Sequence, residues 1–223
     1  MTDVHETIKD IKSKFRLFMN GKVSQSMREK GLDYKLNFGI EYPRIKEIAS
    51  GYDKDHALAQ ALWKEPVREC KIMAGLLQPV DTFYPEIADI WIEDMHYPEI
   101  AEYTVMNLFQ HLPYASDSAF KWMADERMYF RLCGLLLMAR LLMKGGVMNE
   151  RAEAEFLDQA GTALEGDAPV VQKAAALALR KYALQSDANF KQIQRQLHAW
   201  EASTDSMIQG LANEIKNEIE YQP

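Results

Sequence analysis

Apolar residues recur at intervals of three and four along almost the whole sequence. The pattern is clear after Pro66, in Val67, Cys70, Met73, Ala74 and Leu77. This spacing places the side chains on one face of a helix. No comparable run alternates with the period of two that is typical of a strand. The sequence therefore predicts an all-α protein.

Prolines mark where several helices begin. Pro66, Pro98 and Pro169 each precede a long apolar run, and the first helical turn tolerates a residue without an N–H. Together with capping and glycine signals, these positions predict helices at 3–19, 24–30, 43–49, 55–63, 66–77, 84–94, 98–110, 117–124, 126–144, 150–164, 169–185, 188–202 and 205–220.

From residue 55 onward the predicted helices form pairs joined by short connections. The second helices begin near 66, 98, 126 and 169, a spacing of roughly 30 to 43 residues that is typical of HEAT-type repeats. The segments that begin at Arg68, Arg131 and Lys173 also share a basic residue, then a small residue, then an apolar run. We expect a HEAT-like superhelix, an α-α solenoid whose second helices line a concave binding face. An irregular helical domain without repeats remains the alternative.

No stretch of the sequence is typical of a linker between domains. Gly145-Gly146 and the segment 166–169 are long enough only for turns. We therefore expect one all-helical domain over 1–223, with an N-terminal helical segment at 1–50 and stacked pairs at 55–220.

Charge is distributed unevenly along the chain, whose formal net charge is −7. Residues 1–50 carry ten Lys and Arg against seven Asp and Glu, whereas residues 51–125 carry five against thirteen. Affinity for phosphates comes from Lys and Arg. The net charge thus argues against nonspecific DNA binding by the whole surface, and only the first segment is basic.

The sequence lacks the motifs that define several common binding and catalytic sites. The sequence has no phosphate-binding glycine loop, no H-E-x-x-H and no G-x-S-x-G. Its five histidines are scattered singly, and Cys70 and Cys133 lie inside apolar helices. We therefore expect no metal, no cofactor and buried thiols. With no signal peptide pattern and no apolar run of membrane-spanning length, the predicted location is the cytoplasm, without a membrane.

Carboxylates are dense at the predicted helix junction between Trp91 and Glu102. Glu99 and Glu102 are three positions apart in one helix and can share a face. They are candidate catalytic acids. The alternative is structural, because acidic residues in a first turn complement the helix dipole whatever the function.

The order of these features resembles the AlkD-type DNA alkylation repair proteins, a family of HEAT-like repeat DNA glycosylases. The resemblance covers roughly residues 30 to 190. It rests on Asp33–Ala49, Ala59–Cys70, Trp91–Glu102, Arg131 and Gln172–Tyr182.

This resemblance implies a concave face that holds duplex DNA. In active members a Trp-Asp-x-x-Asp stretch and a second Trp surround the lesion, an Arg steadies the backbone, and the second Asp supports release of cationic N3- or N7-alkylpurines. A carboxylate near the sugar stabilises the developing oxocarbenium charge. Here that stretch falls on Pro98-Glu99-Ile-Ala-Glu102, the Arg on Arg131, and the second Trp on Leu177.

The lesion pocket that the resemblance implies is therefore altered. Glu102 keeps the key charge but moves it by a methylene, and a displacement of about 1 Å can reduce a rate on the order of a hundredfold. Both aromatic residues are replaced, and Tyr97 or Tyr103 could substitute for one only if the helix start shifts. A divergent glycosylase with weak activity and a non-catalytic relative that binds unusual DNA both remain open.

The leading interpretation is a DNA alkylation repair-like protein that binds duplex DNA in a concave groove. Its predicted phosphate contacts are Arg44, Lys46, Arg68, Lys71, Arg131, Lys173 and Arg180. The acidic segment 51–125 instead favours a helical scaffold that binds a protein partner, and a different helical enzyme is a third alternative.

Overall fold

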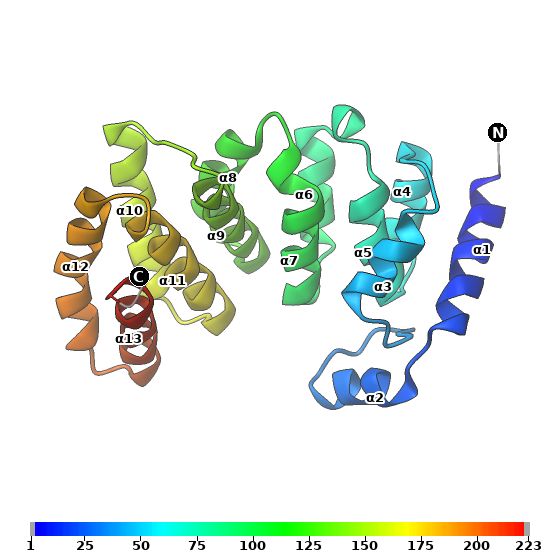
Figure 1. Ribbon diagram of the computed structural model, residues 1–223, viewed down its shortest axis with the longest axis horizontal. Coiled ribbons are helices and arrows are strands. Elements are labelled where there is room, and N and C mark those ends of the chain that lie inside the picture. The colour runs from blue at the N-terminus through cyan, green and yellow to red at the C-terminus, as the bar shows by residue number, and fades with distance from the viewer. Residues whose placement is uncertain (1–2, 221–223) are drawn as a thin grey trace. The chain divides into compact units, whose positions relative to one another are not determined.

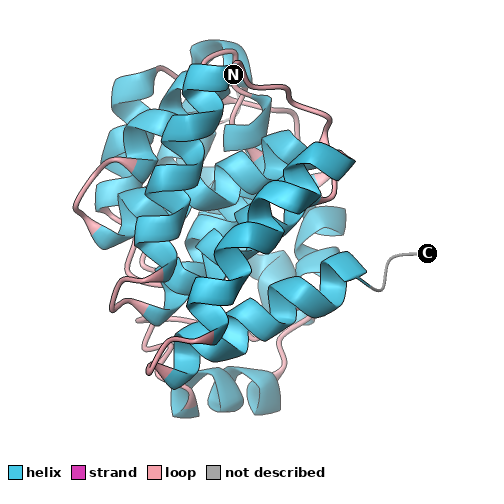
Figure 2. Cartoon of the chain, turned by 90° about the vertical axis from the view of Figure 1, so that its left-hand side faces the viewer, coloured by secondary structure: helices cyan, strands magenta, loops and turns pink. Residues whose placement is uncertain are grey.

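The computed structural model describes residues 3–220, which form thirteen α-helices and two short 3-10 helices. Figure 2 shows helices and loops only, and the β-pairing found in this part of the chain is one isolated bridge between Leu36 and Val67. The predicted all-α class is confirmed. Each predicted helix is present, with ends within a few residues of the expected positions.

The helices group into two compact units, one ending at Pro113 and one beginning at Tyr114. The expectation of one domain across both stays a prediction. The first unit contains α1 (Val4–Leu17), α2 (Gly21–Glu29), α3 (Tyr42–Ala49), α4 (His56–Lys64), α5 (Arg68–Leu77), α6 (Pro85–Glu93) and α7 (Pro98–Asn107), with 3-10 turns at Val80–Thr82 and Phe109–His111. The second contains α8 (Ala115–Met123), α9 (Met128–Met143), α10 (Glu150–Leu164), α11 (Pro169–Ala183), α12 (Asp187–Glu201) and α13 (Ser206–Glu220).

In the first unit α5 is the central helix. It packs against α3, α4 and α7, while α1 covers α4 (Figure 1). Almost every residue of α5 is buried, including Arg68 and Glu69 at its start. A charged pair at the start of a buried helix must find partners inside the protein, because burying an unpaired charge is costly. These two residues therefore organise the surrounding loops.

In the second unit the helix pairs stack through their second members. Helices α9 and α11 pack together, and α11 packs in turn on α13. α10 and α12 lie against α11 beside this row. This is the arrangement that repeated helix pairs predict. Gly134 allows α8 and α9 to approach closely, because a Cβ at this position would lie 2.4 Å from the backbone nitrogen of Met123.

The start of α5 differs from its prediction for a reason that the structure shows. Pro66 was expected to open the second helix of a pair, but α5 begins at Arg68. The residues before it are extended, because the Leu36 N–H donates to the Pro66 carbonyl and the Arg68 N–H donates to the Leu36 carbonyl. Pairing with the loop at residue 36 thus delays the helix by two residues.

Both thiols are enclosed. Cys70 and Cys133 are fully buried within α5 and α9, and burial raises the pKa of Cys70 to about 12 and also raises the pKa of Cys133. They pack as small apolar residues, in agreement with the sequence.

None of the helices in the described range has both the length and the hydrophobicity of a membrane span. The expected cytoplasmic location stays a prediction. Among residues 3–220, no three His, Cys, Asp or Glu side chains are grouped so that they could hold a metal ion.

Candidate nucleic-acid interface

Arg68 and Glu99 form a buried ion pair between α5 and α7. The Nε of Arg68 donates to both carboxylate oxygens of Glu99, at 3.0 and 3.1 Å, and one terminal nitrogen donates to Oε2 at 3.1 Å. Their side chains are 3% and 18% exposed. Burial alone would lower the pKa of Arg68, but the hydrogen bond and charge of Glu99 raise it overall. Charge-assisted pairs of this two-pronged kind are strong and geometrically specific.

The same pair holds the loop between α2 and α3. The Tyr34 hydroxyl donates to Glu99 at 2.7 Å, and the other terminal nitrogen of Arg68 donates to the Ile40 carbonyl at 3.0 Å. Glu69 accepts the backbone N–H groups of Phe38 and Ile40, each at 3.2 Å. Burial, then the neighbouring Glu99 charge, raises the pKa of Tyr34. We name Tyr34, Arg68, Glu69 and Glu99 the buried cluster.

Glu102 lies one turn after Glu99 and is exposed. Partial desolvation of its carboxylate, followed by the negative charge of Glu99, raises its pKa. Unlike Glu99, it has no hydrogen bond or ion pair among the described residues. Of the two predicted catalytic acids, Glu102 is therefore the one whose carboxylate is open to a ligand.

Tyrosines pack around the start of α7. Tyr97 precedes the helix, with its ring centroid 4.3 Å from that of Tyr34. Tyr103 stacks on Tyr42, with centroids 4.8 Å apart and planes inclined by 14°. Burial raises the pKa of Tyr103, an effect that the nearby Arg68 opposes. Both predicted replacements for a lesion-pocket Trp thus already have an aromatic partner within the first unit.

The predicted phosphate-binding residues of the first unit differ in accessibility. Lys46 is exposed without a partner in the described chain, and Arg44 is exposed, paired with Glu47 and placed over the Phe18 ring at 4.5 Å. Lys71 is largely enclosed, and it donates to Asp94 at 2.6 Å and to the Trp63 carbonyl at 2.9 Å. Arg68 is enclosed by the buried cluster. Only the two residues on α3 present a cation to solvent.

The second unit contains the remaining predicted contacts. Lys173 on α11 is exposed, with no ion pair in the described part of the chain, whereas Arg180 pairs with Glu218 on α13 at 2.6 Å. Arg131 on α9 is half-buried, and its Nε donates to the Asp125 carbonyl at 3.2 Å. Lys173 is thus the least constrained of the three.

Sequence reasoning missed a pocket of about 500 Å³ in the first unit. Trp63 and Trp91 stack at 4.1 Å in its wall, and the ammonium of Lys71 lies over the Trp63 ring at 4.6 Å. Each Trp is nearly fully buried, and the faces of Trp63 are occupied by protein groups. These aromatic rings therefore stabilise the fold and offer little face for a base to stack on.

The sequence profile of the family described as "DNA alkylation repair enzyme" matches residues 11–199. The chain belongs to this family. No match was found among curated proteins. A solved structure described as "A new family of proteins related to the HEAT-like repeat DNA glycosylases with affinity for branched DNA structures" is similar to 95% of this chain, over 82% of its own length. The TM-score is 0.73 at 16% identity, so this similarity shows the HEAT-like helical fold.

In this member of the DNA alkylation repair family, the residues that align with the lesion pocket of active members lie in both units. Pro98, Glu99 and Glu102 lie on α7 of the first unit. Arg131 and Leu177 lie on α9 and α11 of the second, where Leu177 is half-buried.

Proposed function

We propose that this family member binds DNA through its phosphate backbone and releases alkylated bases slowly or not at all. Family membership supports a role with DNA. The exposed cations Lys46 and Lys173 have no acidic partner in the described structure, so they are available to replace the counterions of a phosphate chain. The description of the similar solved structure gives that protein family affinity for branched DNA structures, which makes branched DNA the first alternative substrate to compare with linear duplex.

The observation that carries slow or absent release is the replacement of both lesion-pocket tryptophans, together with the engagement of Glu99. Its carboxylate accepts bonds from Arg68 and from Tyr34, so it cannot also orient a water at a sugar without breaking a buried ion pair. The two positions matched to the lesion-pocket tryptophans hold Pro98 and Leu177. A cation–π contact is worth about 0.5 to 2 kcal/mol, and neither residue can provide one.

Binding is tested by titrating labelled linear duplex, three-way and four-way junction DNA with the protein at several salt concentrations. We expect Lys173→Ala or Arg131→Ala to weaken binding similarly for all sequences. Each should reduce the slope of log affinity against log salt by about one. Lys191→Ala removes an exposed lysine from α12, a first helix of its pair, and serves as the matched control. Unchanged slopes in both Lys173→Ala and Arg131→Ala would count against the proposed DNA binding, and no DNA binding at all would favour a protein-binding scaffold.

Base release is tested on duplex that contains 7-methylguanine. We expect wild-type protein to release the base at or near the uncatalysed rate. Measurable release that is lost in Glu102→Gln would instead identify a weak glycosylase, because a neutral amide stabilises oxocarbenium charge less well than an anion. Release that persists in Glu102→Gln would remove this residue from the mechanism.

A further inference from the structure

The turn between α1 and α2 exposes three consecutive large apolar side chains. Leu17, Phe18 and Met19 are 79%, 42% and 61% exposed; we call them the apolar tip. Single exposed apolar residues are ordinary on protein surfaces. Three in succession make this turn unusually apolar, and clustered exposed apolar residues are typical of an interaction site.

The backbone beside the tip is firmly attached to the first unit. The Asn20 N–H donates to the Phe38 carbonyl at 2.8 Å, and the Asn20 side chain caps α2 through the Val23 N–H. Gly39 has a φ of +69°, and a Cβ there would lie 2.3 Å from the Asn20 carbonyl oxygen. The loop at residues 38–39 is in turn held by Glu69 of the buried cluster. The tip is therefore presented by a fixed turn.

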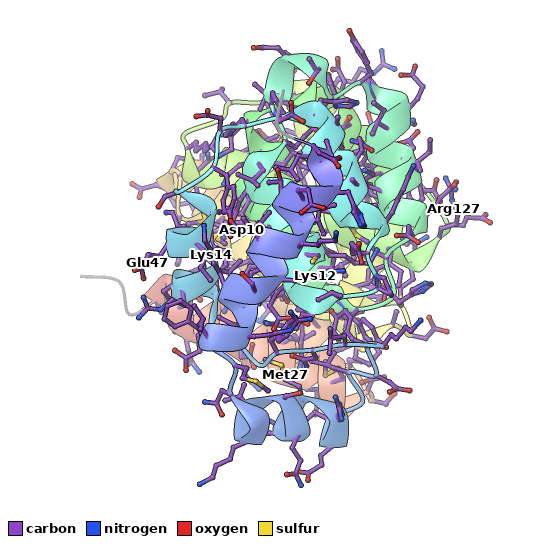
Figure 3. The ribbon with its side chains drawn as sticks, turned by 90° about the vertical axis from the view of Figure 1, so that its right-hand side faces the viewer. Asp10, Lys12, Lys14, Met27, Glu47 and Arg127 are labelled. Atoms are coloured by element: carbon purple, nitrogen blue, oxygen red, sulfur yellow. The ribbon has the colours of Figure 1, made fainter. Side chains whose placement is uncertain are left out.

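The sequence on either side of the tip is basic. The segment 11–28 contains five cations and no acidic residue. Figure 3 shows Lys12 and Lys14 pointing to opposite sides of α1, where they pair with Glu65 and Asp10. The other three, Arg16, Lys22 and Arg28, are exposed, with no acidic partner within the described chain.

Arg44 lies over the aromatic ring of Phe18, and part of the ring remains open to solvent. The Arg44 guanidinium lies 4.5 Å from its ring centroid, and the ring remains 42% exposed. An aromatic ring with a cation behind it is suited to stack on a nucleobase, since every base offers a π-face. Proteins that distort DNA also insert Phe, Leu or Met between base steps.

We propose that the apolar tip occupies the interrupted base stack at a DNA branch or break, while Arg16 and Lys22, which are exposed without an acidic partner within the described chain, hold the flanking phosphates. The proposal rests on the proposed DNA-binding function and extends it to the recognition of a discontinuity. An intact duplex offers the tip no place without unstacking a base step, whereas a branch point has already lost that stacking. A basic apolar surface also suits an anionic membrane, but family membership favours DNA, so the membrane becomes an outcome of the test.

The test compares the full-length protein with Phe18→Ala and Leu17→Ser on two labelled DNAs of equal length, an intact duplex and a three-way junction. A 2-aminopurine base at the branch reports local stacking. We expect either variant to weaken junction binding about tenfold, to leave duplex binding nearly unchanged, and to abolish the 2-aminopurine response. Phe18→Trp should restore both.

Val147→Ser is the matched control, because Val147 is an exposed apolar residue in the second unit. Thermal unfolding checks that each variant folds, and Leu17→Ser removes a side chain with little packing. Equal loss on junction and duplex, or no loss on either, would overturn the tip proposal alone. Loss of binding to anionic vesicles with junction binding intact would overturn it in favour of a membrane. Wild-type protein that binds neither DNA would overturn the proposed function as well.

Discussion

At the scale of single residues, replacing Arg68 distinguishes a structural role of this side chain from its predicted role as a phosphate contact. Because Arg68→Ala leaves Glu99 and Glu69 buried without their cation, we expect it to lower the free energy of unfolding by about 3 kcal/mol, measured with urea. Lys9→Ala, which breaks the exposed pair with Glu6, should change stability little. A stable Arg68→Ala protein with a reduced salt slope of DNA binding would instead make Arg68 a phosphate contact.

Glu102 predicts a pH dependence of stability. Its pKa in the folded protein is raised from 4.5, first by desolvation and then by Glu99, so the folded state favours the protonated acid. The stabilising contribution is therefore complete below the unfolded pKa and is lost as pH rises through the folded value. We expect Glu102→Gln to be more stable than wild type at neutral pH, with the difference disappearing below about pH 4.5. Urea unfolding at several pH values measures this, and a gain that grows on acidification would contradict it.

The sequence could not assign the roles of residues in the buried cluster. Arg68 matched a recurring basic position of the repeats, and Glu99 occupied a first turn, so each had a sufficient local explanation. Their pairing depends on the contact of α5 with α7 and on Tyr34, which is more than thirty positions from Arg68. The informative signal was an Arg-Glu pair that opens a helix whose following residues are almost all apolar.

At the scale of helices, two glycines offer a matched comparison. Gly134→Ala would place a Cβ 2.4 Å from the backbone of α8, whereas the space around Gly210 in α13 is open. We expect Gly134→Ala to destabilise the protein by roughly 1 to 3 kcal/mol through overpacking. Gly210→Ala should stabilise it by about 0.5 to 1 kcal/mol through helix propensity. Thermal or urea unfolding of both variants checks this, and equal effects would refute the close approach of α8 and α9.

The helices themselves were predictable, because an apolar period of 3.6 and terminal signals such as Pro98 and Pro169 are local properties. The late start of α5 was not, since it depends on Leu36 pairing with the strand-like residues before Arg68. The apolar tip was also missed. Leu17 to Met19 continued the apolar pattern of α1 in the sequence, but the helix ends at Leu17 and leaves them uncovered.

For the whole molecule, the stacking of second helices predicts that the last pair acts as a cap. α13 packs on α11 and α12, and its buried side chains include Ile208, Leu211, Ala212 and Ile215. A chain that ends at Ser186 should expose that face of α11, so we expect a lower soluble fraction and stronger binding of a hydrophobic dye. A synthetic peptide of residues 187–220 should reverse the dye binding. An unaltered soluble fraction after truncation would show that α11 needs no cap.

The burial of the two cysteines provides a built-in reporter for each unit. Cys70 lies in the first unit and Cys133 in the second, and both are protonated and closed to solvent at neutral pH. Only the thiolate reacts readily with an electrophile. In the folded protein, methylating agents that damage DNA should therefore leave both sulfurs intact. The labelling rate of each thiol measures how often its own unit opens, so residue-resolved labelling can show whether the two units unfold together or one at a time.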